Sequence, residues 1–580
     1  MINAIKNTIK NNEIISFDIF DTLLVRPYYK PDDLFLHIEY LENVPGFKKL
    51  RNIAEDTAIK KKTFDEEISI NDIYENVSPE YKYLKEKELE LEHRTLQINP
   101  EMFDMFNYAK SLNKKIIITS DMYLPYEFVE KVLNKNAITG YCKLYLSSKE
   151  NKTKRTGSLY KKILKDLNVS PDKIFHIGDN KNSDWQIPQQ MGINSFLYPK
   201  IMTQFVNDNI PFSCLIKKKK MSLGTSISLG ICAINWIKSK KTDNYFYNLG
   251  FNIAGTPNYI FCDFINKQAL TNNIDRIFFV ARDGYTLENS FKFFNKNIAT
   301  NYVTLNRFQN KIESFIQGKN LNKDEQLQIM LFLKQIFPDD KIIKNYNIDT
   351  ANLNNFISDN YDMLKELLSQ YQKNFYNYIT DKIDKKVRNI MIADSITNGF
   401  SAARLAQKIL TNKNIYSISL QTTAKSVPKG IKSLYLLKLK TKYDGFENWN
   451  LMELFFSAPT SQVLGVDFSG NFIYGEENSY ETSNITAYKH ISNGMVDFVK
   501  TAKTIFDDYD LFININDTKM WVDNFCINYT DFDYEKIKNL FHSDNNDKTY
   551  TNIIKYKSLF KRKFDNNIKL IKKFVANVLS

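Results

Sequence analysis

The sequence has few cysteines and no long apolar segment. Only five of its 580 residues are cysteine, and none lies in a CxxC pair or at the spacing of a zinc site. This predicts a reducing compartment and no disulfide framework. The most apolar stretch, Met221–Ile237, is interrupted by Ser, Gly, Thr and Asn, so we expect no transmembrane helix. The first residues lack the apolar region of a signal peptide. The sequence therefore predicts a cytoplasmic protein.

The charge balance is positive but not concentrated. The formal net charge is +13, yet the lysines are dispersed and interleaved with acids, which argues against a nucleic-acid partner. Locally basic stretches occur at Lys217–Lys220 and Lys555–Lys573. The second lies in the amphipathic segment Ile553–Leu579, for which we predict a terminal helix packed on the second domain. The alternative is peripheral contact with anionic lipid at the inner face of the membrane, or with a membrane-bound glycosyltransferase.

The chain is too long for a single hydrophobic core, and its patterning predicts an α/β fold in several parts. Strands and helices alternate over residues 1–210, which predicts a Rossmann-like parallel sheet with a helical insert at about 28–100. After a linker at Lys217–Lys220 we expect a second α/β domain over 222–475. Residues 476–580 are predicted to be a mostly helical, basic C-terminal region.

The expected strands of the first domain end in polar residues that suit catalysis. An apolar run at Ile14–Phe17 ends in Asp18, and Lys115–Ser120 and Lys173–Gly178 end in Ser120 and Asp179. Ligands of parallel α/β sheets bind at the carboxyl ends of the strands. We therefore expect Asp18, Ser120 and Asp179 to share one site.

Four motifs occur in order, and together they resemble the haloacid dehalogenase (HAD) superfamily of hydrolases. They are Phe17-Asp18-Ile-Phe20-Asp21-Thr22, Ile118-Thr-Ser120, Lys154-Arg-Thr-Gly-Ser-Leu-Tyr160 and Gly178-Asp179-Asn-Lys-Asn-Ser-Asp184. The match covers about residues 10–200. It implies a carboxylate nucleophile that forms an aspartyl-phosphate, with Mg²⁺ to neutralise charge.

The resemblance also implies a role for each motif residue. Asp18 is the nucleophile and, with Asp179 and the backbone carbonyl of Phe20, a ligand of Mg²⁺, for which oxygen ligands are suited. Asp184 orients the metal shell. Ser120 hydrogen-bonds a phosphoryl oxygen, and Lys154 pairs with both nucleophile and phosphate. Thr22 holds the loop after the nucleophile.

The helical insert and two further motifs make the resemblance to the family more specific. The insert lies where many family members carry a cap that closes over a small substrate, so the resemblance implies a small phosphorylated metabolite such as a sugar phosphate. Ser16–Leu23 and Ser120–Pro125 resemble a bacterial subgroup encoded among surface-polysaccharide genes, beside or fused to glycosyltransferases. This suggests a role and partners in polysaccharide synthesis. For Met122–Pro125 itself we favour a tight turn that packs its aromatic ring into the core.

One departure from the family pattern concerns the general acid. Family phosphatases place an acid two residues after the nucleophile, where this chain has Phe20, and Asp21 follows one residue later. Three outcomes remain: Asp21 or a cap residue supplies the proton for an ordinary hydrolysis, the reaction is phosphoryl transfer or another substitution, or the domain binds without turnover. The last would make the chain an assembly protein. A lost general acid typically costs about 10²–10⁴ in rate.

The second domain carries polar motifs without an assigned reaction. Arg282–Tyr285 and Asp394–Gly399 each follow an expected strand and precede a helix, and Glu453–Pro459 lies further on. Such a turn can be ordinary capping, or it can bind an anion at the helix N-terminus. Asp394–Gly399 distantly resembles the ribose-phosphate loop of phosphoribosyltransferases. A sugar or nucleotide site, or a transferase activity, is the further hypothesis here. His176, on an apolar strand, is predicted to be a packed core residue.

Overall fold

The computed structural model describes most of the chain as two compact units. Its described residues are 1–209, 212, 216, 221–239, 244–295, 297–346, 352–439, 449–475, 479–506, 515–544 and 549–552. By contacts between residues, unit 1 comprises 1–243 with 504–517, and unit 2 comprises 244–503 with 518–580. Each unit is described by itself.

Unit 1 is built on a five-stranded sheet with the order β5-β4-β1-β6-β7, in which every pairing is parallel. The strands are β1 (Ile14–Phe17), β4 (Lys115–Ser120), β5 (Lys143–Leu146), β6 (Ile174–Gly178) and β7 (Asn194–Leu197). All residues of β1 and β6 are buried, as expected for central strands covered on both faces. The predicted Rossmann-like α/β fold is confirmed.

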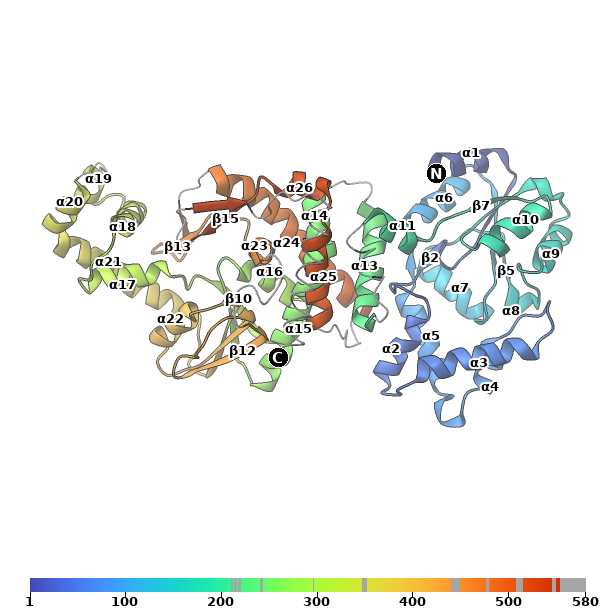
Figure 1. Ribbon diagram of the computed structural model, residues 1–580, viewed down its shortest axis with the longest axis horizontal. Coiled ribbons are helices and arrows are strands. Elements are labelled where there is room, and N and C mark those ends of the chain that lie inside the picture. The colour runs from blue at the N-terminus through green and yellow to red at the C-terminus, as the bar shows by residue number, and fades with distance from the viewer. Residues whose placement is uncertain are drawn as a thin grey trace, which may run out of the picture. The chain divides into compact units, whose positions relative to one another are not determined.

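Helices cover both faces of this sheet (Figure 1). The flanking helices are α1 (Ile2–Asn11), α6 (Pro100–Ser111), α7 (Tyr126–Lys135), α8 (Ser147–Glu150), α9 (Ser158–Leu167) and α10 (Ile187–Gln190), with short turns η2 (Pro171–Lys173) and η3 (Lys181–Gln186). Leu159 and Ile163 of α9 pack with Ile14 and Ile174 on one face. Phe17, which points the other way, contacts Phe106 of α6.

A helical insert separates β1 from β4. It contains β2 (Leu24–Val25), α2 (Asp33–Leu41), α3 (Phe47–Lys61), α4 (Ile70–Glu75), η1 (Pro79–Tyr81), α5 (Leu84–Thr95) and β3 (Gln97–Ile98). Antiparallel pairing of β2 with β3 closes its base. Inside it, the fully buried Arg51 donates from Nε and Nη2 to Glu88 at 2.8 and 2.9 Å. Tyr123, from the loop after β4, also donates to Glu88, at 2.9 Å, so its ring joins the insert and not the sheet core.

Unit 1 continues past the sheet into α11 (Ile201–Asp208) and α13 (Leu223–Ser239). Helix α13 packs on α11, α2 and α6. A Cβ at Gly230 would lie 2.1 Å from the carbonyl carbon of Pro27, so only glycine allows this close approach. Because of this packing, the division between units falls at residue 243 and not within 210–222. The predicted linker Lys217–Lys220 lies outside the described residues.

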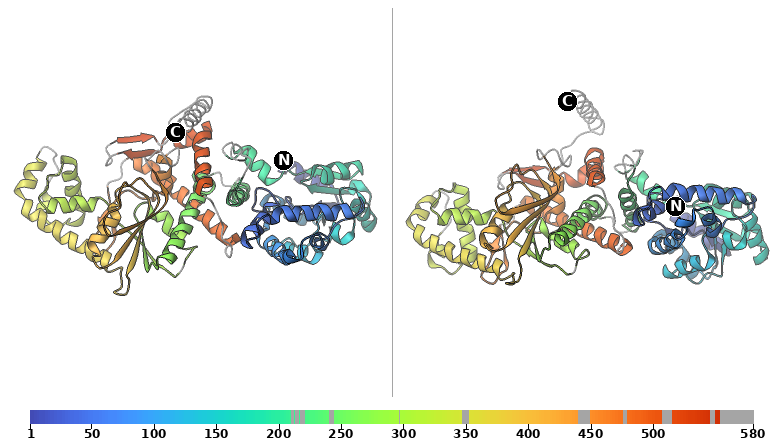
Figure 2. Two further views of the ribbon diagram at one scale, coloured as in Figure 1. Left: turned by 60° about the horizontal axis from the view of Figure 1, so that its bottom comes forward. Right: turned by 90° about the horizontal axis from the view of Figure 1, so that it is seen from below.

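Unit 2 contains a second parallel sheet with the order β12-β11-β10-β8-β9. Its strands are β8 (Arg276–Val280), β9 (Ala299–Val303), β10 (Asn389–Thr397), β11 (Asn414–Thr422) and β12 (Ile431–Lys438). Helices α15 and α22 lie on opposite sides of it (Figures 1 and 2). The predicted second α/β pattern is therefore present.

The remaining elements of unit 2 are mostly helices. They are α14 (Tyr245–Leu249), η4 (Gly250–Ala254), α15 (Gly255–Thr271), α16 (Gly284–Phe291), α17 (Phe308–Ile316), α18 (Lys323–Ile336), α19 (Lys341–Asn345), α20 (Leu353–Asp359), α21 (Tyr361–Thr380), α22 (Ser401–Ile409), α23 (Trp449–Phe456), α24 (Ser479–Phe506, its last residues in unit 1), α25 (Ile515–Asn528) and α26 (Asp531–Ile537). Two antiparallel pairs complete it, β13 (Val463–Val466) with β14 (Phe472–Tyr474) and β15 (Phe541–Asp544) with β16 (Thr549–Asn552).

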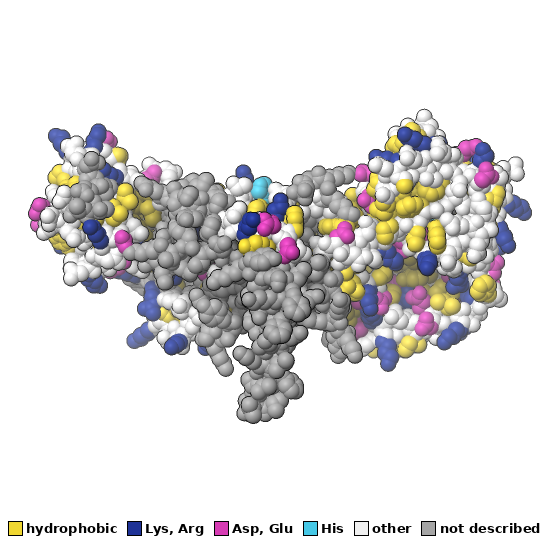
Figure 3. All heavy atoms as spheres, turned by 45° about the horizontal axis from the view of Figure 1, so that its top comes forward, with side chains coloured by type: hydrophobic (Ala, Val, Ile, Leu, Met, Phe, Trp, Pro, Cys, Tyr) yellow, Lys and Arg dark blue, Asp and Glu magenta, His cyan; other side chains and the backbone are white. Residues whose placement is uncertain are grey.

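Two findings bear on the membrane and charge expectations. Among the described residues, no helix is both long and apolar enough to cross a membrane. On the face drawn in Figure 3, basic and acidic side chains are interspersed over the described surface. The basic segment Ile553–Leu579 lies outside the described residues, so its packing or lipid contact stays a prediction.

Candidate active site

Asp18 stands where the three central strands of unit 1 end. Its backbone N–H donates to the carbonyl of Ile177 at 2.9 Å. Phe17 is in register with Ile118 of β4 and with Ile177 of β6, so Ser120 and Asp179 follow at the same edge of the sheet. Both Asp18 and Ser120 are buried. The tertiary structure thus brings together the strand-end residues that the sequence analysis selected.

Lys154 forms hydrogen bonds with both Asp18 and Asp184. Its Nζ donates to Asp18 Oδ1 at 2.7 Å and to Asp184 Oδ1 at 2.5 Å. The three side chains are almost fully enclosed, with 3% of Lys154, 7% of Asp18 and 1% of Asp184 exposed. One cation shared by two buried carboxylates stabilises both while leaving one negative charge in excess. This excess suits a site that receives a divalent cation.

The pKa values of Asp18 and Asp184, the two carboxylates that Lys154 contacts, shift in opposite directions. Burial raises the pKa of Asp18 to about 7, although Lys154 works against it. Burial works in the same direction on Asp184, but Lys154 and His176 outweigh it and hold the pKa of Asp184 well below its ordinary value. Burial also raises the pKa of Asp179. Asp18 is therefore the carboxylate that gains most when further positive charge is bound.

His176 is fully buried, as predicted for a core residue, but it also holds Asp184. Its Nε2 lies 3.2 Å from Asp184 Oδ1, and its Nδ1 lies 2.8 Å from the Ser16 hydroxyl, which contacts Thr119 at 2.9 Å. A carboxylate only accepts hydrogen bonds, so the Nε2–H donates to Asp184. Spacing alone did not reveal this contact, because the two residues meet only through the turn after β6.

Two further residues that sequence reasoning missed hold the loops of the site. The carboxylate of Asp121 accepts from the backbone N–H of Lys154 at 2.8 and 3.0 Å, and burial raises its pKa to about 6. The side chain of Asn99 donates to the carbonyl of Thr22 at 2.7 Å. Thr22 in turn donates to Asp179 at 3.4 Å. The acid directly after Ser120 was the available signal for Asp121.

Three carboxylates of the site are arranged to hold a metal ion. Oxygen atoms of Asp18, Asp179 and Asp184 all lie within 4.8 Å of one another. Such a set of hard oxygen donors fits Mg²⁺. A Cβ at Gly178 would lie 2.4 Å from Cγ of Asp184, so the glycine makes room for this carboxylate. Phe20, the predicted carbonyl ligand, lies two residues past Asp18 and forms a bridge with Leu24.

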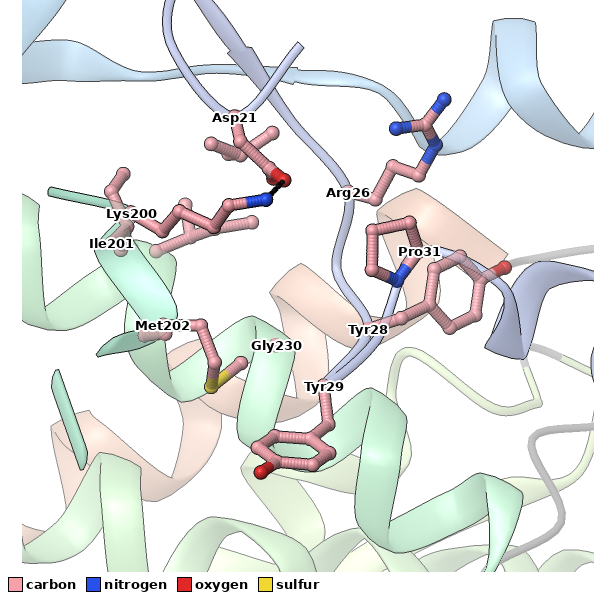
Figure 4. A pocket seen from close by; sticks show the side chains of 12 residues that line it. Asp21, Arg26, Tyr28, Tyr29, Pro31, Lys200, Ile201, Met202 and Gly230 are labelled. Carbon is pink, nitrogen blue, oxygen red and sulfur yellow. Dashed lines mark hydrogen bonds and ion pairs between the residues drawn. The ribbon is translucent and has the colours of Figure 1, made fainter. Parts of the chain in front are cut away.

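Phe20 and Asp21 point to different partners. The ring of Phe20 lies 4.7 Å from the guanidinium carbon of Arg26, which makes a buried, bidentate ion pair with Glu92 of the insert. Asp21 has a φ of 57°, and this left-handed conformation directs its carboxylate to Lys200 at 2.8 Å (Figure 4). Lys200 also reaches Asp179 Oδ2, at 3.1 Å. Asp21 is thus paired with Lys200, which also contacts Asp179, one of the three carboxylates spaced for a metal ion.

A cavity of about 430 Å³ lies between the insert and the sheet domain. Residues of the insert and of the loop after β4 line it, among them Arg26, Asp32, Glu55, Asp56, Glu92 and Tyr123. Four of these six are carboxylates and one is a guanidinium, which already pairs with Glu92. The lining is therefore acidic, and Arg26, which belongs to it, also contacts Phe20, two residues past Asp18.

The first part of the chain is similar to known proteins. A family model described as haloacid dehalogenase-like hydrolase matches residues 13–192. Similar solved structures include L-2-haloacid dehalogenase from Xanthobacter autotrophicus (11% identity, 37% of this chain and 87% of that chain, TM-score 0.28). Another is a HAD phosphatase from Thermococcus onnurineus (16%, 32% and 85%, TM-score 0.25). A third is described as a predicted phosphoglycolate phosphatase from Haemophilus somnus 129pt (12%, 33% and 91%, TM-score 0.24). No curated protein matches the chain. Residues 13–192 therefore match the haloacid dehalogenase-like hydrolase family.

Proposed function

We propose that unit 1 is a Mg²⁺-dependent phosphohydrolase that acts on a small phosphorylated metabolite through an aspartyl-phosphate on Asp18. The observation that carries the proposal is Lys154, which contacts both Asp18 and Asp184 inside a nearly closed site. Asp179 completes a set of oxygen atoms spaced for one divalent ion. Phosphoryl transfer depends mainly on positioning and charge neutralisation, and this cluster supplies both.

Each residue then has a defined task. A Mg²⁺ held by Asp18 and Asp179, with Asp184 beside it, would neutralise negative charge at the site. Asp18 attacks phosphorus with the oxygen that Lys154 does not hold, and the bond from phosphorus to the leaving-group oxygen breaks. Lys154 balances the negative charge of nucleophile and phosphate. Ser120, at the neighbouring strand end, donates to a phosphoryl oxygen. Water then hydrolyses the aspartyl-phosphate and regenerates Asp18.

Protonation of the leaving group falls to Asp21 or to an acid of the insert. Asp21 serves only when it leaves Lys200, because this ion pair occupies its carboxylate. Glu55 and Asp56 line the cavity where a leaving group would lie. Glu55 accepts from Arg51 at 2.8 Å, which leaves Asp56 as the insert acid we favour.

The acidic cavity favours a hydroxyl-rich leaving group over one that carries a carboxylate. Like charges placed together cost free energy, and this cost is largest when water is excluded. The hydroxyls of a sugar donate hydrogen bonds to carboxylates such as Glu55 and Asp56. We therefore propose a sugar phosphate as the substrate class, in keeping with a role in surface-polysaccharide synthesis beside a glycosyltransferase.

Phosphate release by the full chain tests the proposal. The panel comprises hexose and pentose phosphates, with phosphoglycolate as the carboxylate-bearing comparison, each measured with Mg²⁺ and with excess chelator. We expect Mg²⁺-dependent release from at least one sugar phosphate, at a higher kcat/KM than from phosphoglycolate. Asp18→Asn should remove it, whereas Asp172→Asn, at an exposed aspartate outside the site, should not. Equal release by wild type and Asp18→Asn would defeat the proposal.

A second candidate function is binding without turnover, as part of an assembly for polysaccharide synthesis. It is favoured by Phe20, which packs on Arg26 where the family places its acid, and by the ion pair of Asp21. In this case the full chain would bind a sugar phosphate with Mg²⁺ in calorimetry and release no phosphate. Measurable, Asp18-dependent turnover excludes it.

A further inference from the structure

The sheet of unit 2 reverses its strand order next to β8. The chain passes from β8 through α16 to β9 on one side, and later returns to β10 on the other side of β8 before continuing to β11 and β12. In open parallel sheets, ligands bind at such a switch point, in the crevice outside the carboxyl ends of the two diverging strands. A ligand of unit 2 is therefore expected outside the carboxyl ends of β8 and β10.

Polar side chains gather at this place although the strands are otherwise apolar. Asp283 lies three residues past β8, and its carboxylate accepts a hydrogen bond from the hydroxyl of Ser395 in β10. Asp394, the neighbour of Ser395, is half-buried, as is Asp283. Ser395 alternates with Asp394 along β10, so Asp283 and Asp394 lie toward opposite faces of the strand end, and two such poorly solvated acids lower the stability of the fold. Their presence is better explained by a ligand than by packing.

Gln421 in β11 provides an independent observation. It is fully buried, and neither its amide nitrogen nor its amide oxygen has a hydrogen-bond partner. Ser419, two residues earlier, is 1% exposed and its hydroxyl is likewise unpartnered. Asp394 is in register with Ser419, and Ile396 with Gln421. Side chains in register on parallel strands share a face of the sheet, so Asp394, Ser419 and Gln421 lie side by side at the carboxyl edge.

The two acids differ in the pKa of their carboxyl groups. Burial, with Asp283 beside it, raises the pKa of Asp394 to about 8. Burial raises the pKa of Asp283 to about 6, although the hydrogen bond from Ser395 works against it. Asp394 is therefore the more readily protonated of the two, and a protonated carboxyl group can both donate and accept. Gln421 and Ser419 each can do both.

We propose that the carboxyl edge of the unit 2 sheet, beside its switch point, binds a neutral monosaccharide unit, held by Asp394, Ser419 and Gln421. Alternating donors and acceptors match the hydroxyls of a sugar ring. A cation is the less suitable ligand, because among the described residues only the Asp18 cluster has three potential metal ligands within bonding range of one ion. This site is separate from the phosphohydrolase site of unit 1 and does not depend on the function proposed there.

The test compares two buried glutamines of unit 2 by the same substitution. Gln421→Leu removes an amide without partners, so the midpoint of thermal unfolding should stay or rise. Gln309→Leu removes an amide that donates to Tyr371 at 3.1 Å and to the carbonyl of Leu464 at 2.9 Å, so the midpoint should fall. Binding of glucose, galactose, mannose and N-acetylglucosamine to the full chain is measured by ligand-observed NMR titration, with inorganic phosphate as the anionic probe.

We expect at least one neutral sugar to bind wild type and Asp18→Asn alike, which places it outside the phosphohydrolase site. Gln421→Leu and Asp394→Asn should each weaken this binding at least tenfold, and Gln309→Leu should leave it unchanged. The proposal is overturned if none of the four sugars binds, if only phosphate binds, or if Gln421→Leu binds as wild type does. A midpoint that falls as far in Gln421→Leu as in Gln309→Leu also overturns it, because water then satisfies the amide and its role is structural.

Discussion

Replacing Lys154 by methionine should lower the free energy of unfolding, because it leaves two buried carboxylates without their cation. The side chain lies within 2.7 Å of Asp18 and 2.5 Å of Asp184, and all three groups are buried. Removing the shared cation leaves two carboxylates without compensation, and breaking a buried pair in this way typically costs about 3–5 kcal/mol. For a unit of this size, about 1 kcal/mol shifts the midpoint by roughly 2–4 °C. The expected loss in metal-free protein is therefore about 6–20 °C.

The dependence of the variant's stability on Mg²⁺ and on pH distinguishes this explanation from a simple packing defect. Mg²⁺ replaces the missing positive charge, so saturating Mg²⁺ should raise the midpoint of Lys154→Met more than that of wild type. Against the effect of burial, Lys154 also holds the pKa of Asp184 below its ordinary value of 3.8, so without it the folded variant retains a carboxyl proton that wild type and the unfolded chain release. Its stability deficit should therefore widen as the pH rises from about 5 to about 8.

Differential scanning calorimetry of the full chain measures both effects. The transition that Mg²⁺ shifts identifies unit 1, which is necessary because a chain of two units need not unfold in one step. Lys161→Met, at an exposed lysine of α9, is the control and should change the stability by less than about 0.5 kcal/mol. The reasoning is refuted if metal-free Lys154→Met unfolds within about 2 °C of wild type, or if Mg²⁺ stabilises both proteins equally.

Three other substitutions probe the same site. Gly178→Ala forces a methyl group against Asp184 and should cost about 1–3 kcal/mol and weaken Mg²⁺ binding in calorimetry; an unchanged affinity would contradict the geometry. Lys200→Met removes a partly exposed cation from Asp179, so Mg²⁺ should bind up to about fivefold more tightly. The free energy of unfolding should change by less than about 1 kcal/mol. Weaker Mg²⁺ binding would show that Lys200 supports the site. His176→Phe removes the hydrogen bond that holds Asp184 and should lower kcat with little change in KM; a changed KM alone would refute a positioning role.

The local sequence was sufficient to predict most of the first fold and the chain positions of its site. Buried parallel strands are continuous apolar runs, and ligands collect at their carboxyl ends. The run before Asp18 therefore indicated both a central strand and a functional carboxylate, and the later runs indicated Ser120 and Asp179 in the same way. The second parallel sheet was predicted by the same reasoning. A resemblance spread over four motifs then supplied the expected chemistry.

Only the tertiary structure decided which side chains meet. His176 on an apolar strand is indistinguishable in sequence from a packed residue, and its bond to Asp184 arises because the turn after β6 folds back over Gly178. The direction of Asp21 depends on a left-handed backbone angle and on Lys200, 179 residues away. Gln421 has no local signal at all, since an unpartnered amide is defined by what surrounds it in space. Periodicity reports the burial of one strand or helix at a time, whereas distances between residues remote in sequence arise only when the sheets assemble.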